Sequence, residues 1–420
     1  MNVLVCPDKF KGTLDALAAA RAIARGWRSV RPGDHLELLP ISDGGDGFGS
    51  LLGQRLQLEA RRIRTVDAAH RPCSTPWWRS RDGSIAIVES ARAIGLAMLP
   101  PGKFHPFELD TFGLGKVLRA ACKGAISGRV AGRLRAGRQR VSRQREPGQS
   151  IQTLVGIGGS ATNDGGFGVA RALGWRFHDR RGLAIERWTE LDRLVRLVPP
   201  AANETGLGLD QWGSDCNEGE GRLPVEGEGH GEGGRGGLVV AVDVSNPLLG
   251  PQGASRVYGP QKGLRREDFR RAEKCLGRLA EVVRDMSGTD YAATPGAGAA
   301  GGLGFGLRAF AGARIEPGFD LFADYAGLEA KLREAELVIT GEGSIDRSTL
   351  MGKGVGLVAA HCASLNIPCV GLAGMVAPEA KRAPTFTAVR ALTDLTSSPD
   401  AMARAAYWLG RLAAALAREF

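Results

Sequence analysis

The sequence predicts a protein of the α/β class with two domains, one of them discontinuous and the other inserted into it. Three observations support this prediction. Strands alternate with helices at both ends of the chain, antiparallel hairpin patterns lie between them, and 420 residues are enough for two hydrophobic cores. We place the crossings near residues 85 and 290, so that 1–85 and 290–420 form one domain and 86–289 forms the other.

The N-terminal segment opens the discontinuous domain. Asn2–Cys6 has the apolar pattern of a buried strand, and Thr13 is placed to N-cap an alanine-rich helix that ends at about Ser29. Leu36–Ile41 predicts the second strand. This alternation of strand and helix favours a parallel sheet.

A polar turn follows each of these two strands. The first turn is PDKFKG at 7–12, and the second is SDGGDG at 42–47. Open α/β sheets bind ligands at the carboxyl ends of their strands, so we expect the polar side chains of the two turns to converge. They are Asp8, Lys11, Asp43 and Asp46. Asp-Gly pairs are also ordinary turn residues, and that alternative stays open.

The middle of the chain shows hairpin patterns. Thr75–Arg79 with Ile85–Val88 predicts an antiparallel pair at the entry to the second domain. Trp175–His178 with Leu183–Ile185 predicts another hairpin, and Glu190–Val198 predicts a short helix. The change from alternation to hairpins is what separates the two domains.

Two segments of low complexity interrupt the second domain. Residues 123–150 follow a helical pattern over Thr111–Cys122 and are rich in arginine and glycine, whereas residues 200–236 are acidic and glycine-rich. Neither segment has apolar periodicity, so we expect both to be disordered insertions. The net charge of the chain is +10, but the basic segment lacks the aromatic residues that stack on bases and does not favour nucleic acid as a partner.

The last part of the chain returns to strands and helices. Leu238–Asp243 predicts a buried strand that ends in a carboxylate, and Arg266–Asp285 predicts a helix. Leu337–Thr340 and Cys369–Leu372 predict two further strands, and Pro399–Glu419 predicts a closing amphipathic helix. The final strands bring the chain back to the discontinuous domain.

Composition limits the class of protein. The seven cysteines show no C-x-x-C spacing and most lie in apolar surroundings, which indicates reduced thiols rather than a zinc site or a disulfide frame. A strand-like segment directly follows Met1, so we expect no signal peptide, and no apolar run is long enough to span a membrane. We therefore expect a cytoplasmic protein without a membrane partner.

The glycine-rich stretch Leu154–Gly166, LVGIGGSATNDGG, predicts a reaction centre. An apolar strand runs into a glycine turn before a helix, which leaves backbone N–H groups able to bind phosphate oxygens. GIGGSA also matches the dinucleotide fingerprint G-x-G-x-x-A, with Asp179 where a ribose-binding acid would lie. Against that alternative, Thr162–Gly166 delays the helix and places Asp164 beside the phosphates.

Other catalytic motifs are missing from the sequence. It contains neither Walker A, H-E-x-x-H, paired C-x-x-C nor G-x-S-x-G. It does contain carboxylates at strand ends, lysines in glycine-rich loops and phosphate-type turns. Phosphoryl transfer uses such groups to hold a divalent metal, to offset charge and to position the phosphate.

Six blocks in register resemble the bacterial-type glycerate kinase family. They are PDKFKG at 7–12, SDGGDG at 42–47, GIGGSATNDGG at 156–166, DVSNPLLGPQGAS with YGPQKG within 243–263, PGAGAAGGLGFG at 295–306 and TGEGSIDRSTLMGKG at 340–354. The resemblance covers nearly the whole chain apart from the two insertions. Six blocks in order are far more specific than any single block.

The resemblance implies ATP-dependent phosphorylation of D-glycerate at the 2-hydroxyl, giving 2-phospho-D-glycerate, with Mg²⁺ as the metal. It also implies a Rossmann-like parallel-sheet domain and an inserted mixed α/β domain, with the active site in the cleft between them. The partners would be the small molecules D-glycerate and ATP. A homo-oligomer stays open.

The functional positions of the family carry over motif by motif. For catalysis the resemblance implies Asp164, Asp243, Lys11 and Asp43, and for cofactor binding it implies Gly158, Gly159, Ser160, Asn163, Glu342 and Asp346. For substrate binding it implies Asp8, Lys262 and Asn246, and for Mg²⁺ it implies Asp164 and Asp243. The two lysines would offset phosphate or carboxylate charge.

The chain departs from the family pattern at two motifs. TFGLGK at 111–116 stands where the family shows TYGTGE, so a hydroxyl is lost and a charge is reversed. Residues 354–357 lack the proline of the family's GKxPxGVA motif and its rigid turn.

Two alternatives to a glycerate 2-kinase stay open. One is a kinase of a related small hydroxy acid or one forming 3-phosphoglycerate, and the other is a catalytically weak protein that senses a ligand or associates with nucleic acid.

Overall fold

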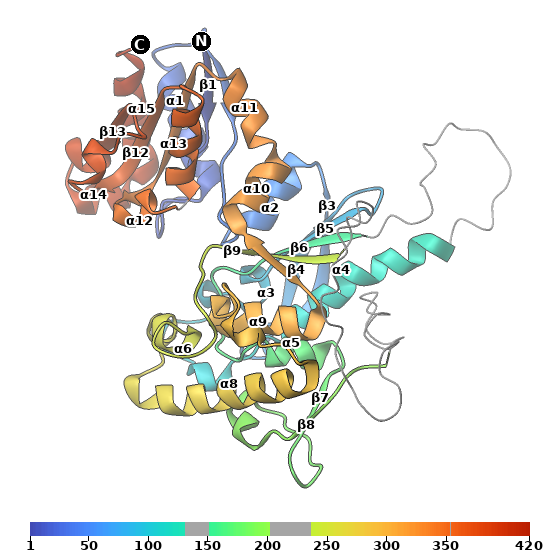
Figure 1. Ribbon diagram of the computed structural model, residues 1–420. Coiled ribbons are helices and arrows are strands. Elements are labelled where there is room, and N and C mark those ends of the chain that lie inside the picture. Colours follow the sequence, from blue (N-terminus) through green and yellow to red (C-terminus); the bar gives the residue numbers. More distant parts are fainter. Residues whose placement is uncertain (131–150, 202–236, 353) are drawn as a thin grey trace, which may run out of the picture. The chain divides into compact units, whose positions relative to one another are not determined.

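The structure is a computed structural model that describes residues 1–130, 151–201, 237–352 and 354–420. Among these residues no helix is both long and apolar enough to cross a membrane. The six cysteines that they include are all free thiols. The predicted α/β class is confirmed, since strands and helices alternate through most of the described chain (Figure 1).

The chain divides into two compact units. The first unit contains Met1–Asp43, Ser50–Leu56 and Gly318–Phe420, and the second contains Gly44–Gly49 and Gln57–Pro317. One unit is therefore discontinuous and the other is inserted, but the changes fall at about residues 57 and 317 instead of 85 and 290. The early change follows because strands at 59–66 and 72–79 pair within the sheet of the second unit, and the late change because a strand at 314–317 joins the same sheet.

The first unit is built on a five-stranded sheet in which every neighbouring pair is parallel. The strand order is β13 (Ala388–Ala391), β12 (Cys369–Val376), β11 (Leu337–Ile345), β1 (Asn2–Val5) and β2 (His35–Leu38). Counted along the chain, this order is 2-1-3-4-5, so the direction of winding reverses between β1 and β11. Open α/β sheets bind ligands beside this reversal, at the carboxyl ends of the strands. The turns after β1 and within β11 are thus the expected ligand positions in this unit.

Two helices of the first unit cross closely because glycines lie at the crossing. A Cβ atom added to Gly26 of α1 (Ala16–Arg28) would lie 2.0 Å from the carbonyl oxygen of Gly410 in α15 (Ala405–Ala417). The fully buried side chains of Ile23 and Trp27 then pack in the same core cluster as Leu409. The alanine-rich composition of both helices favours this short separation.

Three predicted details of the first unit are corrected. Asp15 rather than Thr13 is the N-cap of α1, because the Asp15 carboxylate accepts a hydrogen bond from the Ala18 N–H at 2.7 Å. The predicted closing helix is split into α14 (Ser398–Ala403) and α15, because Arg404 between them has a non-helical φ of −127° and ψ of 37°. The strand β13 was not predicted, since its four residues AVRA carry too weak an apolar pattern.

The second unit is built on a six-stranded mixed sheet. The strand order is β10 (Arg314–Pro317), β9 (Gly237–Val242), β6 (Gln152–Gly156), β5 (Ile85–Glu89), β4 (Pro72–Arg79) and β3 (Glu59–Val66). The first four strands are parallel, and β4 runs antiparallel to both β5 and β3. The predicted hairpin between β4 and β5 is confirmed. The carboxyl ends of β5, β6 and β9 lie together, in the register Glu89 beside Gly156 and Gly156 beside Ala241.

The small hairpin of the second unit differs from the predicted one. β7 (Arg176–His178) pairs with β8 (Arg196–Val198), whereas the predicted partner at 183–185 makes a single bridge, between Ala184 and His178. The predicted helix over Glu190–Val198 is wrong, because Trp188–Arg193 forms a 3-10 helix and the chain then extends into β8. Local periodicity could not distinguish these partners.

The helix α4 (Phe112–Val130) is longer than predicted. It continues beyond Cys122 into the segment that the sequence predicted to be disordered. The rest of that prediction, at 131–150, and nearly all of the acidic segment at 200–236 lie outside the described residues.

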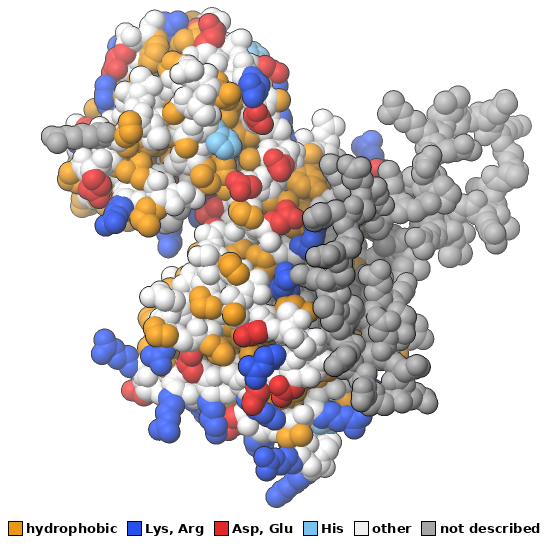
Figure 2. Space-filling model, in the orientation of Figure 1, with side chains coloured by type: hydrophobic (Ala, Val, Ile, Leu, Met, Phe, Trp, Pro, Cys, Tyr) orange, Lys and Arg blue, Asp and Glu red, His pale blue; other side chains and the backbone are white. Residues whose placement is uncertain are grey.

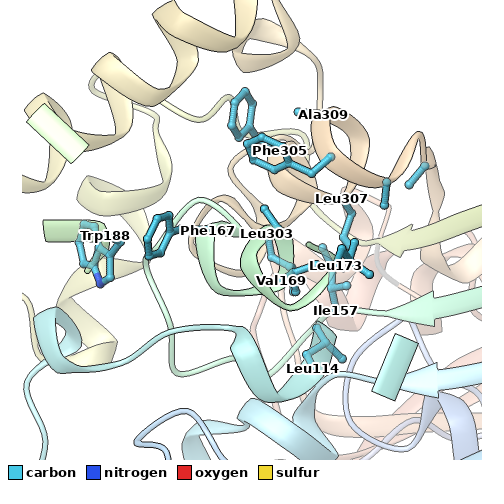
Figure 3. Close-up of a cluster of buried hydrophobic side chains, with 14 of the residues drawn as sticks. Leu114, Ile157, Phe167, Val169, Leu173, Trp188, Leu303, Phe305, Leu307 and Ala309 are labelled. Carbon is cyan, nitrogen blue, oxygen red and sulfur yellow. The ribbon is translucent and has the colours of Figure 1, made fainter. Parts of the chain in front are cut away.

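The core of the second unit includes apolar residues on both sides of the glycine-rich loop (Figure 3). Val169 and Leu173, from α5 (Phe167–Ala172) and its end, group with Leu303 of α9 (Ala299–Ala311), and all three are fully buried. Ile157 lies in the same cluster and is also buried. Because apolar anchors come directly before and directly after the loop 158–166, packing fixes both ends of that loop.

The remaining helices connect these parts. In the first unit they include α10 (Gly318–Ala326), α11 (Leu328–Glu334), α12 (Arg347–Leu350) and α13 (Gly354–Ser364). In the second unit they include α3 (Ala91–Ile94), α6 (Ala254–Val257), α7 (Gly259–Lys262) and α8 (Arg266–Ser287). The helix α2 (Phe48–Arg55) contains residues that belong to both units.

The surface around α8, β7 and β8 carries Lys and Arg side chains interspersed with Asp and Glu (Figure 2). Several of these charges are paired: Lys274 lies 2.9 Å from Asp192, and Arg278 lies 2.6 Å from Glu281. Exposed pairs of this kind contribute little to stability, but they reduce the positive field that an anionic polymer would meet.

Candidate active site

Three carboxylates lie near one another at the carboxyl edge of the first unit's sheet. Asp8 follows β1, Asp43 follows β2, and Glu342 lies in β11. Asp8 is only 9% exposed, and its Oδ1 accepts a hydrogen bond from the Lys9 N–H at 2.6 Å. Burial, together with the negative charges of Asp43 and Glu342, raises the pKa of Asp8 to about 7. A carboxyl group that titrates near neutral pH is suited to exchange a proton with a substrate.

Lys11 lies at the same edge, in the turn between β1 and α1. Its side chain is exposed, in contrast to the buried Phe10 beside it. The turn packs against β11, since a Cβ atom added to Gly343 would lie 3.2 Å from the backbone nitrogen of Lys11. The lysine is therefore held where the winding direction of the sheet reverses. The structure thus brings Asp8, Asp43 and Glu342 together, with Lys11 in the same turn as Asp8. Asp46, which was predicted to converge with them, belongs to the second unit and lies against Gly159.

Asp346 and Glu342 are linked through the short helix α12. Asp346 is its N-cap, and its Oδ1 accepts hydrogen bonds from the N–H groups of Ser348 at 2.7 Å and Thr349 at 3.4 Å. The Thr349 hydroxyl donates to Glu342 Oε1 at 2.7 Å. This geometry explains Asp346 as a helix cap, and its cofactor-binding role stays a prediction.

The glycine-rich loop 158–166 of the second unit packs directly on another backbone segment. The Gly158 N–H donates to the Gly44 carbonyl at 3.2 Å, and a Cβ atom on Gly158 would lie only 2.5 Å from the Gly45 Cα. A side chain at 158 would push the two loops apart. Close backbone packing therefore gives a physical reason for this glycine besides the predicted phosphate contact, which stays a prediction for Gly158 and Gly159.

Asp164 is fully buried and its carboxylate is satisfied by the protein. Its Oδ2 accepts from the Thr111 N–H at 2.9 Å, the Thr111 hydroxyl at 2.8 Å and the Gly168 N–H at 2.9 Å, and its Oδ1 accepts from the Gly166 N–H at 3.2 Å. Burial and the charge of Asp110 raise its pKa to about 6. The arrangement holds the loop in place and leaves the oxygens poorly placed to bind a metal.

Lys262 is a buried cation whose pKa is affected by the charge of Asp164. Its side chain is 7% exposed and donates to the Thr162 carbonyl at 2.7 Å. Burial lowers the pKa of Lys262 to about 7, although the charge of Asp164 acts in the opposite direction. The helix α7 and the loop 158–166 are therefore joined by a lysine that can lose its proton near neutral pH.

Asn163 and Ser160 also make their contacts inside the protein. The Asn163 amide donates to the Ser255 hydroxyl at 2.9 Å, while its Oδ1 is buried without a hydrogen-bond partner among the described residues. The Ser160 hydroxyl lies 2.9 Å from the Thr162 hydroxyl and accepts from the Thr162 N–H at 3.1 Å. Both side chains stabilise the loop, and their cofactor contacts stay predictions.

The loop after β9 combines one exposed acid with a rigid interior. Asp243 is exposed at the carboxyl end of the strand. Asn246 is used internally, since its Oδ1 accepts from the Tyr258 hydroxyl at 2.5 Å and its Nδ2 donates to the Gln252 carbonyl at 2.8 Å. Burial and the charge of Asp243 raise the pKa of Tyr258 to about 12, so that the phenol keeps the proton it donates. Substrate binding by Asn246 stays a prediction.

The dinucleotide alternative finds no support in the geometry. α5 begins only at Phe167, after the interruption that the sequence predicted. Asp179 closes a turn near β7, where its Oδ1 accepts from the N–H groups of Arg181 and Leu183, both at 2.9 Å. A ribose-binding acid would instead follow the strand after the first helix, at the binding edge of the sheet.

Sequence reasoning missed three residues that build this site. Thr111 binds Asp164 through both its N–H and its hydroxyl, Ser255 accepts from Asn163, and Glu89 accepts from the N–H groups of Gly47 and Gly49. Each lies far from its partner in the sequence, so no local pattern connects them. The one available signal for Glu89 is a glutamate that directly follows four apolar residues of a strand.

The described residues include no cluster of three or more His, Cys, Asp or Glu side chains arranged to hold a metal ion. Mg²⁺ in kinases is commonly bound by one or two carboxylates together with substrate phosphates and water. Asp243, exposed at a strand end, fits that smaller demand better than Asp164, which is fully buried and accepts four hydrogen bonds from the protein.

A backbone segment with left-handed conformation at the start of α9 packs against the loop 158–166, and a substitution can test how much this packing stabilises the protein. The Gly165 N–H donates to the Gly301 carbonyl at 3.1 Å, and a Cβ atom on Gly301, whose φ is +75°, would lie 1.9 Å from the Thr162 carbonyl oxygen. We expect Gly301→Ala to destabilise the protein by about 3 kcal/mol or more, because steric overlap adds to the cost of the left-handed backbone. Denaturant unfolding measures this.

Gly288 supplies the matched control, since its φ is +73° and an added Cβ atom would meet nothing within 4 Å. Gly288→Ala should cost about 1 kcal/mol from the backbone alone. Equal losses for the two variants would contradict the importance of close packing at Gly301.

Three comparisons relate this chain to known proteins. The model of the glycerate kinase family matches residues 3–204 and 234–420. A glycerate kinase of Halalkalibacterium halodurans is 33% identical over 378 residues, covering 89% of this chain and 85% of that protein. The glycerate 2-kinase of Escherichia coli (strain K12) is 32% identical over 377 residues, covering 89% and 85%. A solved structure from Salmonella typhimurium LT2, provisionally named glycerate kinase 2, has a TM-score of 0.74 and 30% identity, covering 100% of this chain and 98% of that one.

Proposed function

The chain belongs to the glycerate kinase family, and from this premise we infer that it transfers the γ-phosphoryl group of ATP to D-glycerate, giving 2-phospho-D-glycerate. The observation that carries the inference is the family match over both long stretches of the chain. The relative named glycerate 2-kinase supports transfer to the 2-hydroxyl. The strand-end carboxylates and the lysines near the glycine-rich loops are the groups that phosphoryl transfer requires.

In the first unit, we propose that Asp8 takes the proton of the reacting glycerate hydroxyl. A pKa of about 7 suits a proton acceptor at neutral pH, and the side chain lies where an open α/β sheet binds its ligand. Lys11, exposed in the same turn, is proposed to offset the negative charge of the transferred group. Asp43 supports Asp8 by keeping its pKa high.

In the second unit, we propose Asp243 as the metal-binding carboxylate and Asp164 as the residue that fixes the glycine-rich loop. Asp243 is exposed at a strand end, and Asp164 is buried with four hydrogen bonds. Mg²⁺, when bound with the nucleotide, would neutralise charge on the phosphate oxygens. Lys262 carries a proton that it can release near neutral pH, and its side chain donates a hydrogen bond to the Thr162 carbonyl of the same loop.

Product identification tests the proposed function. Purified protein is incubated with ATP, Mg²⁺ and D-glycerate, and the products are resolved by phosphorus NMR, with L-glycerate as the matched control. We expect 2-phosphoglycerate from the D-isomer and ADP in equal amount. Accumulation of 3-phosphoglycerate would contradict the position of transfer, and a lack of any phosphoglycerate at high enzyme concentration would leave a ligand-sensing role as the better explanation.

A further inference from the structure

The turn Gly44–Gly49 is held on one side by a buried glutamate. Glu89, at the carboxyl end of β5, is 1% exposed. Its Oε1 accepts from the Gly47 N–H at 3.0 Å and its Oε2 accepts from the Gly49 N–H at 3.1 Å. Arg92 completes the set, with its Nε 3.1 Å from Oε1. The single Glu89 carboxylate thus accepts hydrogen bonds from two alternate backbone amides of the turn.

On its other side the turn meets the glycine-rich loop. The Gly158 N–H donates to the Gly44 carbonyl at 3.2 Å, and Gly158 can approach Gly45 only because it lacks a Cβ atom. A Cβ atom on Gly159 would lie 2.6 Å from Asp46 Oδ1, so the Asp46 carboxylate lies directly against this glycine. Both Asp46 and Gly159 are exposed to solvent. The turn therefore presents a carboxylate at the open side of the loop.

We propose that Glu89 is a positioning residue for phosphoryl transfer. It holds the turn Gly44–Gly49, and with it the Asp46 carboxylate, in register with the glycine-rich loop. Glu89 and Gly156 are directly paired in the parallel strands β5 and β6. The turn lies against both of them, since the Gly47 N–H donates to Glu89 and a Cβ atom on Gly156 would lie 2.8 Å from the Gly44 carbonyl oxygen. This role rests on the proposed kinase function.

The two hydrogen bonds that the turn donates explain why a glutamate is needed at position 89. An ionised carboxylate offers an acceptor at each of its two oxygens, and hydrogen bonds to a charged acceptor are stronger than those to a neutral one. A glutamine has one acceptor and one donor group, so it can keep one of the two amides and must face the other with an N–H group. The turn would lose one of its two hydrogen bonds to residue 89, while the size of that side chain stays the same.

A second buried carboxylate in the same unit provides a matched control. Asp67 is 3% exposed and accepts from the Ala69 N–H at 2.9 Å, the Arg71 N–H at 3.0 Å and the Arg71 Nε at 2.7 Å. It therefore bonds two backbone amides and one arginine, as Glu89 does. The turn that it holds joins β3 to β4, which are the two strands that follow β5 at that edge of the sheet. Asp67→Asn removes a buried charge paired with an arginine, as Glu89→Gln does, but at a turn other than Gly44–Gly49.

The experiment compares kcat, the KM values for ATP and D-glycerate, and the melting temperature of the wild type, Glu89→Gln and Asp67→Asn. We expect Glu89→Gln to lower kcat by about 10- to 100-fold, since small misplacements of reacting groups have effects of this size. Asp67→Asn should keep kcat within twofold, although it also lowers the melting temperature. Gly158→Ala, which displaces the same turn from its other side, should lower kcat as well, and the double variant Glu89→Gln with Gly158→Ala should be little worse than either single variant.

The outcomes separate this role from the function on which it depends. Wild-type turnover with a Glu89→Gln kcat within twofold would overturn the positioning role alone. An Asp67→Asn loss as large as that of Glu89→Gln would also overturn it, because general destabilisation would then explain both. A wild-type protein that forms no phosphoglycerate would refute the proposed function and this role with it.

Discussion

Asp164→Asn is expected to lower kcat by about 100-fold while the protein remains folded. The Asn oxygen can occupy the position of Oδ2 and keep the hydrogen bonds from Thr111 and Gly168. The Asn amide then faces the Gly166 N–H, a donor against a donor, and the negative charge beside Lys262 is lost. The loop 158–166 would shift at its end and the nearby lysine would bind its proton less tightly. Steady-state kinetics with ATP and D-glycerate measure the loss.

Asp164→Ala separates the fold from the reaction. It removes every bond to the carboxylate, and breaking a buried and charged contact of this kind costs about 3–5 kcal/mol. The alanine variant should therefore melt at a clearly lower temperature than the asparagine variant. Asp179→Asn is the control, since Asp179 holds a turn in the same unit and should leave kcat unchanged. An Asp164→Asn enzyme with wild-type kcat would show that neither the charge nor the loop end matters to turnover.

The sequence predicted the strands well where the apolar pattern is local and strong. The apolar patterns at 2–6 and 154–157 become β1 and β6, and the strand predicted at Leu36–Ile41 overlaps β2 at 36–38. Asp8 and Asp43, which follow β1 and β2, lie at the predicted edge of the first unit's sheet. Asp8, Asp43 and Glu342 come together because parallel strands end on the same side of a sheet. That rule needs only the order of elements, which the sequence reveals.

Contacts between distant residues could not be predicted in the same way. Asp164 is bound by Thr111 and the turn at Gly47 is bound by Glu89, and no periodicity links these positions. The predicted partner of β7 was wrong for the same reason, since the true partner at 196–198 and the predicted one at 183–185 have similar apolar patterns. Strand pairing and carboxylate anchoring depend on tertiary packing, which a single sequence expresses only indirectly.

The glycines show how one pattern can have two physical causes. The spacing of the glycines at 156–166 predicted close approach of the backbone to phosphate, and the structure has close approach of backbone to backbone at Gly158. Both require a residue without a Cβ atom. The two explanations are compatible, because packing that fixes the loop also orients its remaining N–H groups.

Asp8→Asn is expected to make the protein more stable at pH 8 and nearly inactive. Asp8 is buried beside two other acids, so its charged form is unfavourable in the folded state, and the neutral amide removes that cost. Loss of a proton acceptor typically lowers turnover by about 100- to 10,000-fold. Asp15→Asn is the matched control in the same segment, because Asn is also a good N-cap and should preserve both stability and kcat. Calorimetry and kinetics on the same samples measure the two effects.

The pH dependence of the stability difference identifies Asp8 as its source. The folded pKa of about 7 lies above the usual value of 3.8, so the folded protein binds more protons than the unfolded chain between these values. Wild-type stability should therefore fall relative to Asp8→Asn as the pH rises from 4 to 7, and the gap should reach about 2–4 kcal/mol above pH 7 and vanish near pH 4. The measurement is made with EDTA and without nucleotide, so that no bound cation offsets the charge. A gap that is constant with pH would mean that Asp8 does not titrate in this range, and a proton-accepting role at neutral pH would lose its basis.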